Sequence, residues 1–360
     1  QRLLRFFQSN MKICLRWQCI YFLLFLVHLR HQITIIILTY KEFSMFDKNE
    51  QNTRRKFEDP WITENGKRRA RVALKSPKIL WFNTGTLCNI KCQNCYIKSS
   101  PTNNALVYIS ANEVSEYLDQ LVTQKWPVAE IGLTGGEPFM NPEILGIIER
   151  CLNRNYKVLI LSNAMQPMMR KNIKEGLVKL NKLFPYKIKL RISLDHFKAI
   201  QHDTERGLGA FEKTLQGMDW LRDTNISTSV AGRTIWGETE LETRAGYSKL
   251  FKKRRYAIDA NDPTDTILFP EINENIETPE ITNDCWNKLE KDPDTVMCSY
   301  SRMVVKRNGM KKPVVLACTL ITTSSEFELG YTLKEAEVDV SLNHATCSKF
   351  CVLGGASCSH

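Results

Sequence analysis

The chain has 360 residues, of which 43% are hydrophobic and 25% are charged, and these fractions are ordinary for a globular protein. They exclude a disordered chain and a collagen-like one. The formal net charge is +11, but nearly half of this excess lies in residues 1–44, where Glu42 is the only acidic residue. A charge excess gathered in one segment disfavours nucleic acid as a partner. The cysteine count, 12, is unusual. Small domains use disulfides because their hydrophobic core is insufficient, but a chain of this length does not need them, so the cysteines require another explanation.

The N-terminal segment, residues 1–44, differs in composition from the rest of the chain. Its apolar run at residues 19–27 is shorter than the about 20 residues of a membrane span, and Arg30 follows it closely. No small-residue cleavage site follows the run, which disfavours a signal peptide. We expect that this segment is not part of the working protein; a membrane anchor and a surface helix are the alternatives. The expected protein is therefore cytoplasmic, with no membrane partner.

Between residues 78 and 270, short apolar runs alternate with segments of helical spacing. Runs typical of strands lie at residues 78–82, 130–134, 157–161, 187–194, 226–230 and 266–269. Helical patterns lie at residues 110–121, 142–152, 168–184, 210–221 and 240–251. Strands separated by helices predict an α/β fold with a parallel sheet, and about six such units predict a partial (β/α)6 barrel. In such folds the functional side chains lie at the carboxyl ends of the strands.

Three cysteines follow the first predicted strand with the spacing C-x3-C-x2-C: Cys88, Cys92 and Cys95. Three thiolates in so short a stretch can bind one small inorganic cluster. A closed zinc or iron–sulfur site uses four ligands, so three protein ligands leave one iron of a cubane cluster open to an external molecule. A structural zinc site completed by a distant residue is the alternative.

This motif resembles that of the radical S-adenosylmethionine (radical SAM) superfamily. A run after the second predicted strand adds to the resemblance: Gly135, Gly136, Glu137 and Pro138. The resemblance covers about residues 78–270. It implies an enzyme with a [4Fe-4S] cluster on the three cysteines, whose open iron binds S-adenosylmethionine. Reductive cleavage of the sulfonium would yield a 5′-deoxyadenosyl radical that abstracts hydrogen from a substrate, while the protein orients and shields the reaction.

The resemblance also implies cofactor-binding roles at the strand ends. The glycines would let the backbone approach the ligand closely, and Glu137 would accept a hydrogen bond from the methionine ammonium. Asn163 would face the ribose or the methionine moiety, with a plain turn as the alternative. Ser193 and Arg206 match family positions that bind the cofactor carboxylate or ribose; a solvated surface side chain is the alternative for Arg206.

The family usually has an aromatic residue just before the third cysteine, and here the chain departs from the pattern. It has Asn94 at that position, with Tyr96 on the other side of Cys95 as the candidate ring for cofactor binding. Asp195, followed by His196, is a candidate proton acceptor. Further candidates for substrate contact lie at the ends of the fifth and sixth strands, and solvated loop residues are the alternative: Arg233, Trp236, Glu238, Pro270 and Glu271.

Half of the cysteines lie after residue 280. The sequence Asn308-Gly309 between apolar runs predicts a hairpin that would bring Cys298 and Cys318 close together. This region resembles the auxiliary-cluster extensions called twitch or SPASM domains. The resemblance implies a second [4Fe-4S] cluster on Cys298, Cys318, Cys347 and Cys351, with Cys358 or Cys285 as substitutes. A structural zinc site is the alternative, and Cys151 is expected to be a buried helical residue.

The chain is therefore expected to have four parts: a doubtful segment at 1–44, a polar extension at 45–77, a radical SAM core at 78–280 and a cysteine-rich auxiliary domain at 281–360. The expected function is that of a radical SAM oxidoreductase or modifying enzyme, acting on a small molecule or a peptide and served by a low-potential electron donor of the flavodoxin or ferredoxin type. The alternative is a non-catalytic zinc or iron–sulfur protein, or a redox sensor.

Overall fold

The structure is a computed structural model that describes residues 55–270 and 277–356. The doubtful N-terminal segment, Glu271 and Cys358 lie outside the described residues.

The central element is a nine-stranded sheet with the order β10-β9-β8-β2-β3-β4-β5-β6-β7. Its first six strands in chain order are β2 (Ile79–Asn83), β3 (Glu130–Thr134), β4 (Lys157–Ser162), β5 (Ile188–Ser193), β6 (Ser227–Arg233) and β7 (Thr266–Phe269). Each pairs in parallel with the next. The six predicted strands and the α/β fold with an open, partial barrel are thus confirmed.

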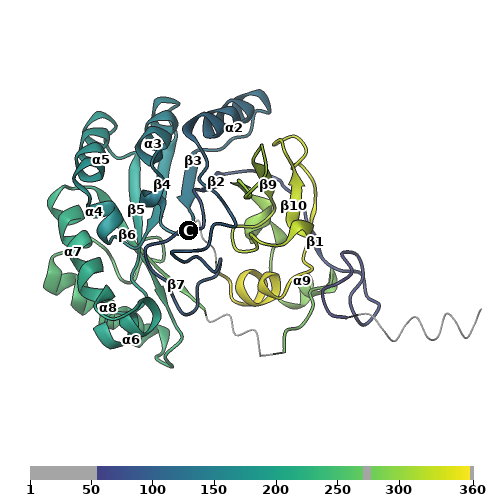
Figure 1. Ribbon diagram of the computed structural model, residues 1–360. Helices are drawn as coiled ribbons and strands as arrows, with labels where there is room; N and C mark the ends of the chain where they lie inside the picture. The colour runs from purple at the N-terminus through teal and green to yellow at the C-terminus, as the bar shows by residue number, and fades with distance from the viewer. Residues whose placement is uncertain (1–54, 271–276, 357–360) are drawn as a thin grey trace, which may run out of the picture.

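Helices connect these strands and lie together on the outer side of the sheet (Figure 1). They are α2 (Ala111–Thr123), α3 (Ile144–Asn153), α4 (Gln166–Met169), α5 (Lys171–Leu183), α6 (Ala199–Arg206), α7 (Ala210–Asp223) and α8 (Glu240–Arg254). Helix α2 begins where the sequence predicts, because Ser110 and Glu113 form a capping box. Strands β2 and β4 are mostly apolar and buried, as in a sheet covered on both faces; every residue of β2 is buried.

Two helical segments differ from the sequence prediction. The pattern at 168–184 is not one helix: Arg170 has an extended backbone (φ −62°, ψ 142°) that separates α4 from α5. Helix α6 was not predicted, because it is short and mostly polar and therefore shows little apolar periodicity.

The predicted C-terminal hairpin is confirmed and extends the main sheet. Strands β8 (Ser301–Val305) and β9 (Val314–Leu316) are antiparallel, and β8 pairs in parallel with β2. Strand β10 (Glu328–Gly330) forms the outer edge beside β9. The short elements of this region are α9 (Asp284–Lys288), η2 (Pro293–Thr295), η3 (Met297–Ser299), η4 (Ser325–Phe327) and η5 (Cys347–Leu353), a π-helical segment.

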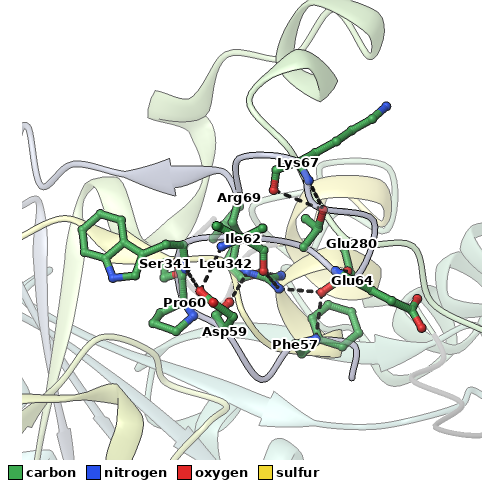
Figure 2. A network of polar contacts seen from close by, with 12 residues as sticks. Phe57, Asp59, Pro60, Ile62, Glu64, Lys67, Arg69, Glu280, Ser341 and Leu342 are labelled. Atoms are coloured by element: carbon green, nitrogen blue, oxygen red, sulfur yellow. Dashed lines mark hydrogen bonds and ion pairs between the residues drawn. The ribbon is translucent and has the colours of Figure 1, made fainter. Parts of the chain in front are cut away.

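The N-terminal extension is joined to this C-terminal region. Strand β1 (Arg71–Val72) pairs with β11 (Val340–Ser341), and the purple and yellow parts of the ribbon lie side by side (Figure 1). Figure 2 shows the polar network that fastens them. The fully buried Arg69 forms an ion pair with Glu280 at 2.5 Å and donates hydrogen bonds to the Asp59 and Leu342 carbonyl oxygens. Segments distant in sequence thus form one small core.

Across residues 55–270 and 277–356, no helix combines the length and the apolar content needed to cross a bilayer.

Candidate active site

A cavity of about 180 Å³ lies at the carboxyl ends of the parallel strands. The three predicted cluster ligands all line it: Cys88, Cys92 and Cys95. They belong to the segment that follows β2, and residues 88–99 form neither helix nor strand. The predicted position of the site, at the ends of the strands, is where the cavity lies.

The thiols lie in an environment that disfavours free thiolates. Cys88 is buried, and burial raises its pKa to about 12. Burial also raises the pKa of Cys92, although the nearby Arg206 guanidinium acts in the opposite direction. Such thiols are stable as thiolates when a metal centre replaces the proton, so binding of metal and loss of protons are coupled here.

The glycines after β3 permit a close approach between two backbones. A Cβ at Gly136 would lie 2.2 Å from the Leu87 carbonyl oxygen, and one at Gly135, where φ is +146°, would lie 2.5 Å from the Gly85 oxygen. Instead the Gly136 amide donates to Gly85 at 2.8 Å. Both glycines also line the cavity. Their first structural role is therefore to hold the chain that enters the cysteine segment.

The buried Glu137 lies beside the cavity, bonded to the end of β4. Its carboxylate accepts hydrogen bonds from the Ser162 hydroxyl (2.9 Å) and from the backbone amides of Asn163 (2.9 Å) and Phe139 (3.2 Å). Burial raises its pKa to about 7 despite these donors. In the structure Glu137 joins β3 to β4, and Pro138, also buried, begins the turn η1 (Pro138–Met140). Their predicted roles in cofactor binding stay predictions.

Four other predicted cofactor-binding residues line the cavity: Tyr96, Asn163, Ser193 and Arg206. The Asn163 side-chain amide donates to the Asn89 side chain at 2.9 Å, inside the cysteine segment. The predicted proton acceptor Asp195 also lines the cavity, but it forms a two-point ion pair with Arg206, at 2.7 and 3.0 Å. Burial would raise the Asp195 pKa, but Arg206 outweighs it and the pKa lies below its ordinary value. Asp195 is thus an ionised partner that orients Arg206.

The predicted substrate contacts divide into two groups. Arg233 lines the cavity. Trp236 and Glu238 instead surround His196: the Trp236 ring lies 4.8 Å from the imidazole, and Glu238 bonds its Nε2 at 3.2 Å. These three residues do not line the cavity. Pro270 accepts a hydrogen bond from the Tyr96 hydroxyl at 3.5 Å.

The C-terminal cysteines gather in one apolar cluster. It contains Cys298 and Cys347, with three more cysteines packed against it: Cys285, Cys318 and Cys351. Burial raises the pKa of Cys347, and the Cys318 and Cys298 thiols lie near enough to raise it further. None of the nine cysteines in the described part of the chain forms a disulfide. Cys151, as expected, is buried in α3.

The C-terminal region also supplies one wall of the cavity, which sequence reasoning missed. Thr319 and Leu320 follow Cys318, and Phe350 precedes Cys351; all three line the cavity. The Phe350 ring packs on Tyr96 at 5.9 Å and on Phe269 at 5.4 Å. No local sequence signal marks these residues, because their position depends on the packing of distant segments.

The residues present fit an iron–sulfur cluster with a bound cofactor. Three thiols share one cavity, and thiolates are the ligands that such a cluster uses. Polar side chains and closely packed backbone also line the cavity, where the cofactor would bind. Within the described ranges, no three or more Cys, His, Asp or Glu side chains converge closely enough to hold a single metal ion.

The chain was compared with known proteins. Residues 82–244 match the model of the radical SAM superfamily. The antilisterial bacteriocin subtilosin biosynthesis protein AlbA of Bacillus subtilis (strain 168) is 35% identical over 145 residues, which are 40% of this chain and 30% of that protein. The crystal structure of Streptococcus suis SuiB bound to S-adenosylmethionine is 12% identical, with a TM-score of 0.52, over 71% of this chain and 63% of that one.

A third similar protein is anSMEcpe, in a structure with bound AdoMet and the Cp18Cys peptide. It is 14% identical, with a TM-score of 0.50, over 72% of this chain and 80% of that one. The two solved structures show the fold that this chain shares. The chain spans about a third of the length of AlbA. Residues 82–244, which include the cysteine motif, thus match the radical SAM superfamily, and the chain shares the fold of the two solved structures.

Proposed function

We propose that this protein is a radical SAM enzyme that oxidises or otherwise modifies a peptide. The observation that carries the proposal is the single cavity shared by Cys88, Cys92 and Cys95 with the glycine turn after β3. A structural metal site has no need of an adjoining cavity. When bound, a [4Fe-4S] cluster with an open iron supplies the electron that cleaves S-adenosylmethionine reductively.

The chain's own residues would bind and orient that cofactor. The three cysteines would hold the cluster, with Asn163, Ser193 and Tyr96 on the wall where the nucleoside or methionine moiety binds. Arg206, oriented by Asp195, would bind the carboxylate, because a guanidinium held by one carboxylate keeps donors for a second. The apolar ring of Phe350 would exclude water from the cavity.

A second cluster is proposed for the C-terminal cysteines. The Cys318 thiol lies near enough to raise the pKa of both Cys298 and Cys347, and Cys298 also raises that of Cys347. Cys351 packs against the same apolar cluster. Cys285 is the alternative fourth ligand, although its sulfur accepts a hydrogen bond from the Thr282 backbone amide and is hydrogen-bonded to the Thr282 hydroxyl. The proposed ligand set is therefore Cys298, Cys318, Cys347 and Cys351.

A peptide is the substrate class that the relatives favour. AlbA is a bacteriocin biosynthesis protein, and anSMEcpe was solved with a bound peptide. The cavity is lined both by the cysteine segment and by residues next to Cys318 and Cys351. A peptide side chain inserted there would lie beside residues that neighbour both proposed clusters.

The test is anaerobic reconstitution of the full chain, with iron and sulfide counted and 5′-deoxyadenosine measured after addition of S-adenosylmethionine and dithionite. We expect about eight irons per chain, as two [4Fe-4S] clusters require, and 5′-deoxyadenosine as a product. Cys92→Ala should abolish 5′-deoxyadenosine formation. Cys151→Ala is the matched control, because this cysteine lies in α3 outside both sets, and it should leave iron content and product unchanged.

The proposed second cluster gives a separate prediction. Cys347→Ala should lower the iron content to about four per chain and leave cofactor cleavage measurable, because the cavity cysteines stay intact. Equal loss of cleavage in Cys92→Ala and Cys347→Ala would contradict separate roles for the two sets. Bound zinc without 5′-deoxyadenosine in the wild-type protein would contradict the whole proposal.

A further inference from the structure

We infer that Glu205 and Arg233 form a clamp that positions the third cluster cysteine, with Asn94 as its contact on the cysteine segment. The inference rests on the proposed function, since it concerns the same cavity. It explains the departure from the family pattern before Cys95.

The cysteine segment depends on outside contacts for its shape. Residues 88–99 form neither helix nor strand, so no regular hydrogen-bond ladder sets the position of Cys95. The residues around it are bonded to two other elements instead. The Gln93 amide donates to the Glu205 carbonyl oxygen at 2.9 Å, on helix α6. The Asn94 carbonyl oxygen accepts from Arg233, at the end of β6, at 3.1 Å.

The side chains complete the clamp. The Asn94 amide donates to Glu205 Oε1 at 2.7 Å, and Arg233 pairs with Glu205 Oε2 at 3.3 Å. Each carboxylate oxygen thus faces one partner, one from the cysteine segment and one from β6. The Arg233 guanidinium also lies 5.0 Å above the Tyr96 ring, on the far side of Cys95. Cys95 is therefore held from both neighbours.

Burial makes the loss of any of these contacts costly. Glu205 is 4% exposed and Arg233 is 7% exposed, so a carboxylate and a guanidinium are held together away from water. A buried carboxylate requires its partners, because loss of one leaves an unsatisfied charge. Asn94 itself is exposed, and its hydrogen bond to Glu205 is partly buried. A phenylalanine ring at this position could not donate the hydrogen bond that Glu205 accepts, whereas the Asn94 side-chain amide does.

The first test uses hydrogen exchange of the metal-free protein. The Gln93 amide is the reporter, because it is bonded to the clamp. We expect Asn94→Ala and Glu205→Ala each to speed the amide hydrogen exchange of residues 93–97 by about tenfold or more. Each substitution removes the hydrogen bond between Asn94 and Glu205, so fewer bonds must break before this segment opens. The double variant should exchange no faster than the faster single variant, because both remove one interaction. Asn181→Ala, which removes a half-buried side chain on α5, is the control and should leave this segment unchanged.

The second test is spectroscopic and uses the reconstituted protein. Addition of S-adenosylmethionine should change the EPR signal of the reduced wild-type cluster, and this signal should be broadened or shifted in Asn94→Ala. The variant's kcat for 5′-deoxyadenosine formation should fall by more than its KM for S-adenosylmethionine rises. If Glu205→Ala does not fold, Asn94→Asp serves instead: it keeps the size of the side chain and places a carboxylate against Glu205, so its effect should exceed that of Asn94→Ala.

The two proposals fail in different ways. A wild-type protein that binds no cluster would contradict the proposed function, while the exchange result in the metal-free protein would still decide the clamp. Unchanged exchange at residues 93–97 in Asn94→Ala, or independent, multiplying effects of the two substitutions, would overturn the clamp even if the wild-type enzyme is fully active.

Discussion

Two fully buried arginines show how single residues hold this protein together. Arg69 has a carboxylate partner, Glu280, and donates its other hydrogen bonds to backbone carbonyls (Figure 2). Arg302 donates to the carbonyl oxygens of Ala336, Cys298, Ser301 and Val338, and burial lowers its pKa to about 10. Arg69 adds to the pairing of β1 with β11, and Arg302 connects β8 to the segment that contains Ala336 and Val338. Their removal would leave several buried carbonyls without donors.

Glu280→Gln should lower the free energy of unfolding at pH 7 by about 1.5–3 kcal/mol, because hydrogen bonds to a buried charge are lost. Burial alone would raise the pKa of Glu280, but the Phe57 amide, Arg69 and the Glu64 amide outweigh it, and the pKa lies below 4.5. A depressed pKa stabilises the fold above the unfolded-state value, and this contribution is lost as the pH falls through the folded-state value.

Urea unfolding of wild type and variant between pH 7 and pH 3 measures this effect. The difference between the two proteins should be largest near neutral pH and should shrink below about pH 4.5. A difference that stays constant over the whole range would show that the carboxylate charge is not what stabilises the network.

At the scale of elements, the turn after β3 and the segment before Cys88 are built as a pair. The backbones of Gly136 and Leu87 approach too closely for any side chain between them. The Glu137 amide donates to the Leu87 carbonyl at 3.1 Å, and the Gly136 amide donates to Gly85. The position of Cys88 therefore depends on the two glycines in the turn after β3, whose lack of side chains permits the close approach.

Gly136→Ala should lower the free energy of unfolding by about 1–3 kcal/mol, because the added Cβ would meet backbone that must move. It should also lower the iron content on reconstitution. Gly146→Ala is the matched control: this glycine lies in α3, its nearest neighbour to an added Cβ is 3.8 Å away, and alanine favours a helix by up to about 1 kcal/mol. Equal unfolding midpoints for the two variants would contradict the close approach.

At the scale of the whole molecule, the C-terminal region and the barrel share one sheet. Trp81 in β2 pairs with Met303 in β8, and both lie in one buried cluster with Phe350. The N-terminal extension closes the arrangement through β1 and β11. The boundary expected near residue 280 therefore separates two stretches of sequence that share one core.

We expect β2 and β8 to unfold together. Hydrogen exchange measured by mass spectrometry at increasing urea should show peptides of β2 and β8 losing protection at the same urea concentration, because breaking their pairing exposes the edge of the parallel sheet. Peptides of α6, a short polar helix, should lose protection earlier and serve as the contrast. Loss of β8 protection well before that of β2 would show that the C-terminal region folds independently.

Much of the fold and the site was predictable from local sequence. The six strands, the capping box of α2 and the hairpin around Gly309 each depend on residues within a few positions of one another. Helix α6 and the break at Arg170 were missed because their patterns are short or continuous with a neighbour. Glu205 and Phe350 were missed as site residues because nothing in their local sequence differs from an ordinary helix or loop.

The sequence by itself determined the resemblance to the radical SAM superfamily, the alternating fold and the three cavity cysteines, because spacing within one short segment is a local property. Only the tertiary structure decided what Glu137, Asp195 and Asn94 touch, and that the C-terminal region walls the cavity. The physical reason is that these contacts join residues far apart in the chain, where the backbone path and burial, rather than residue type, select the partner.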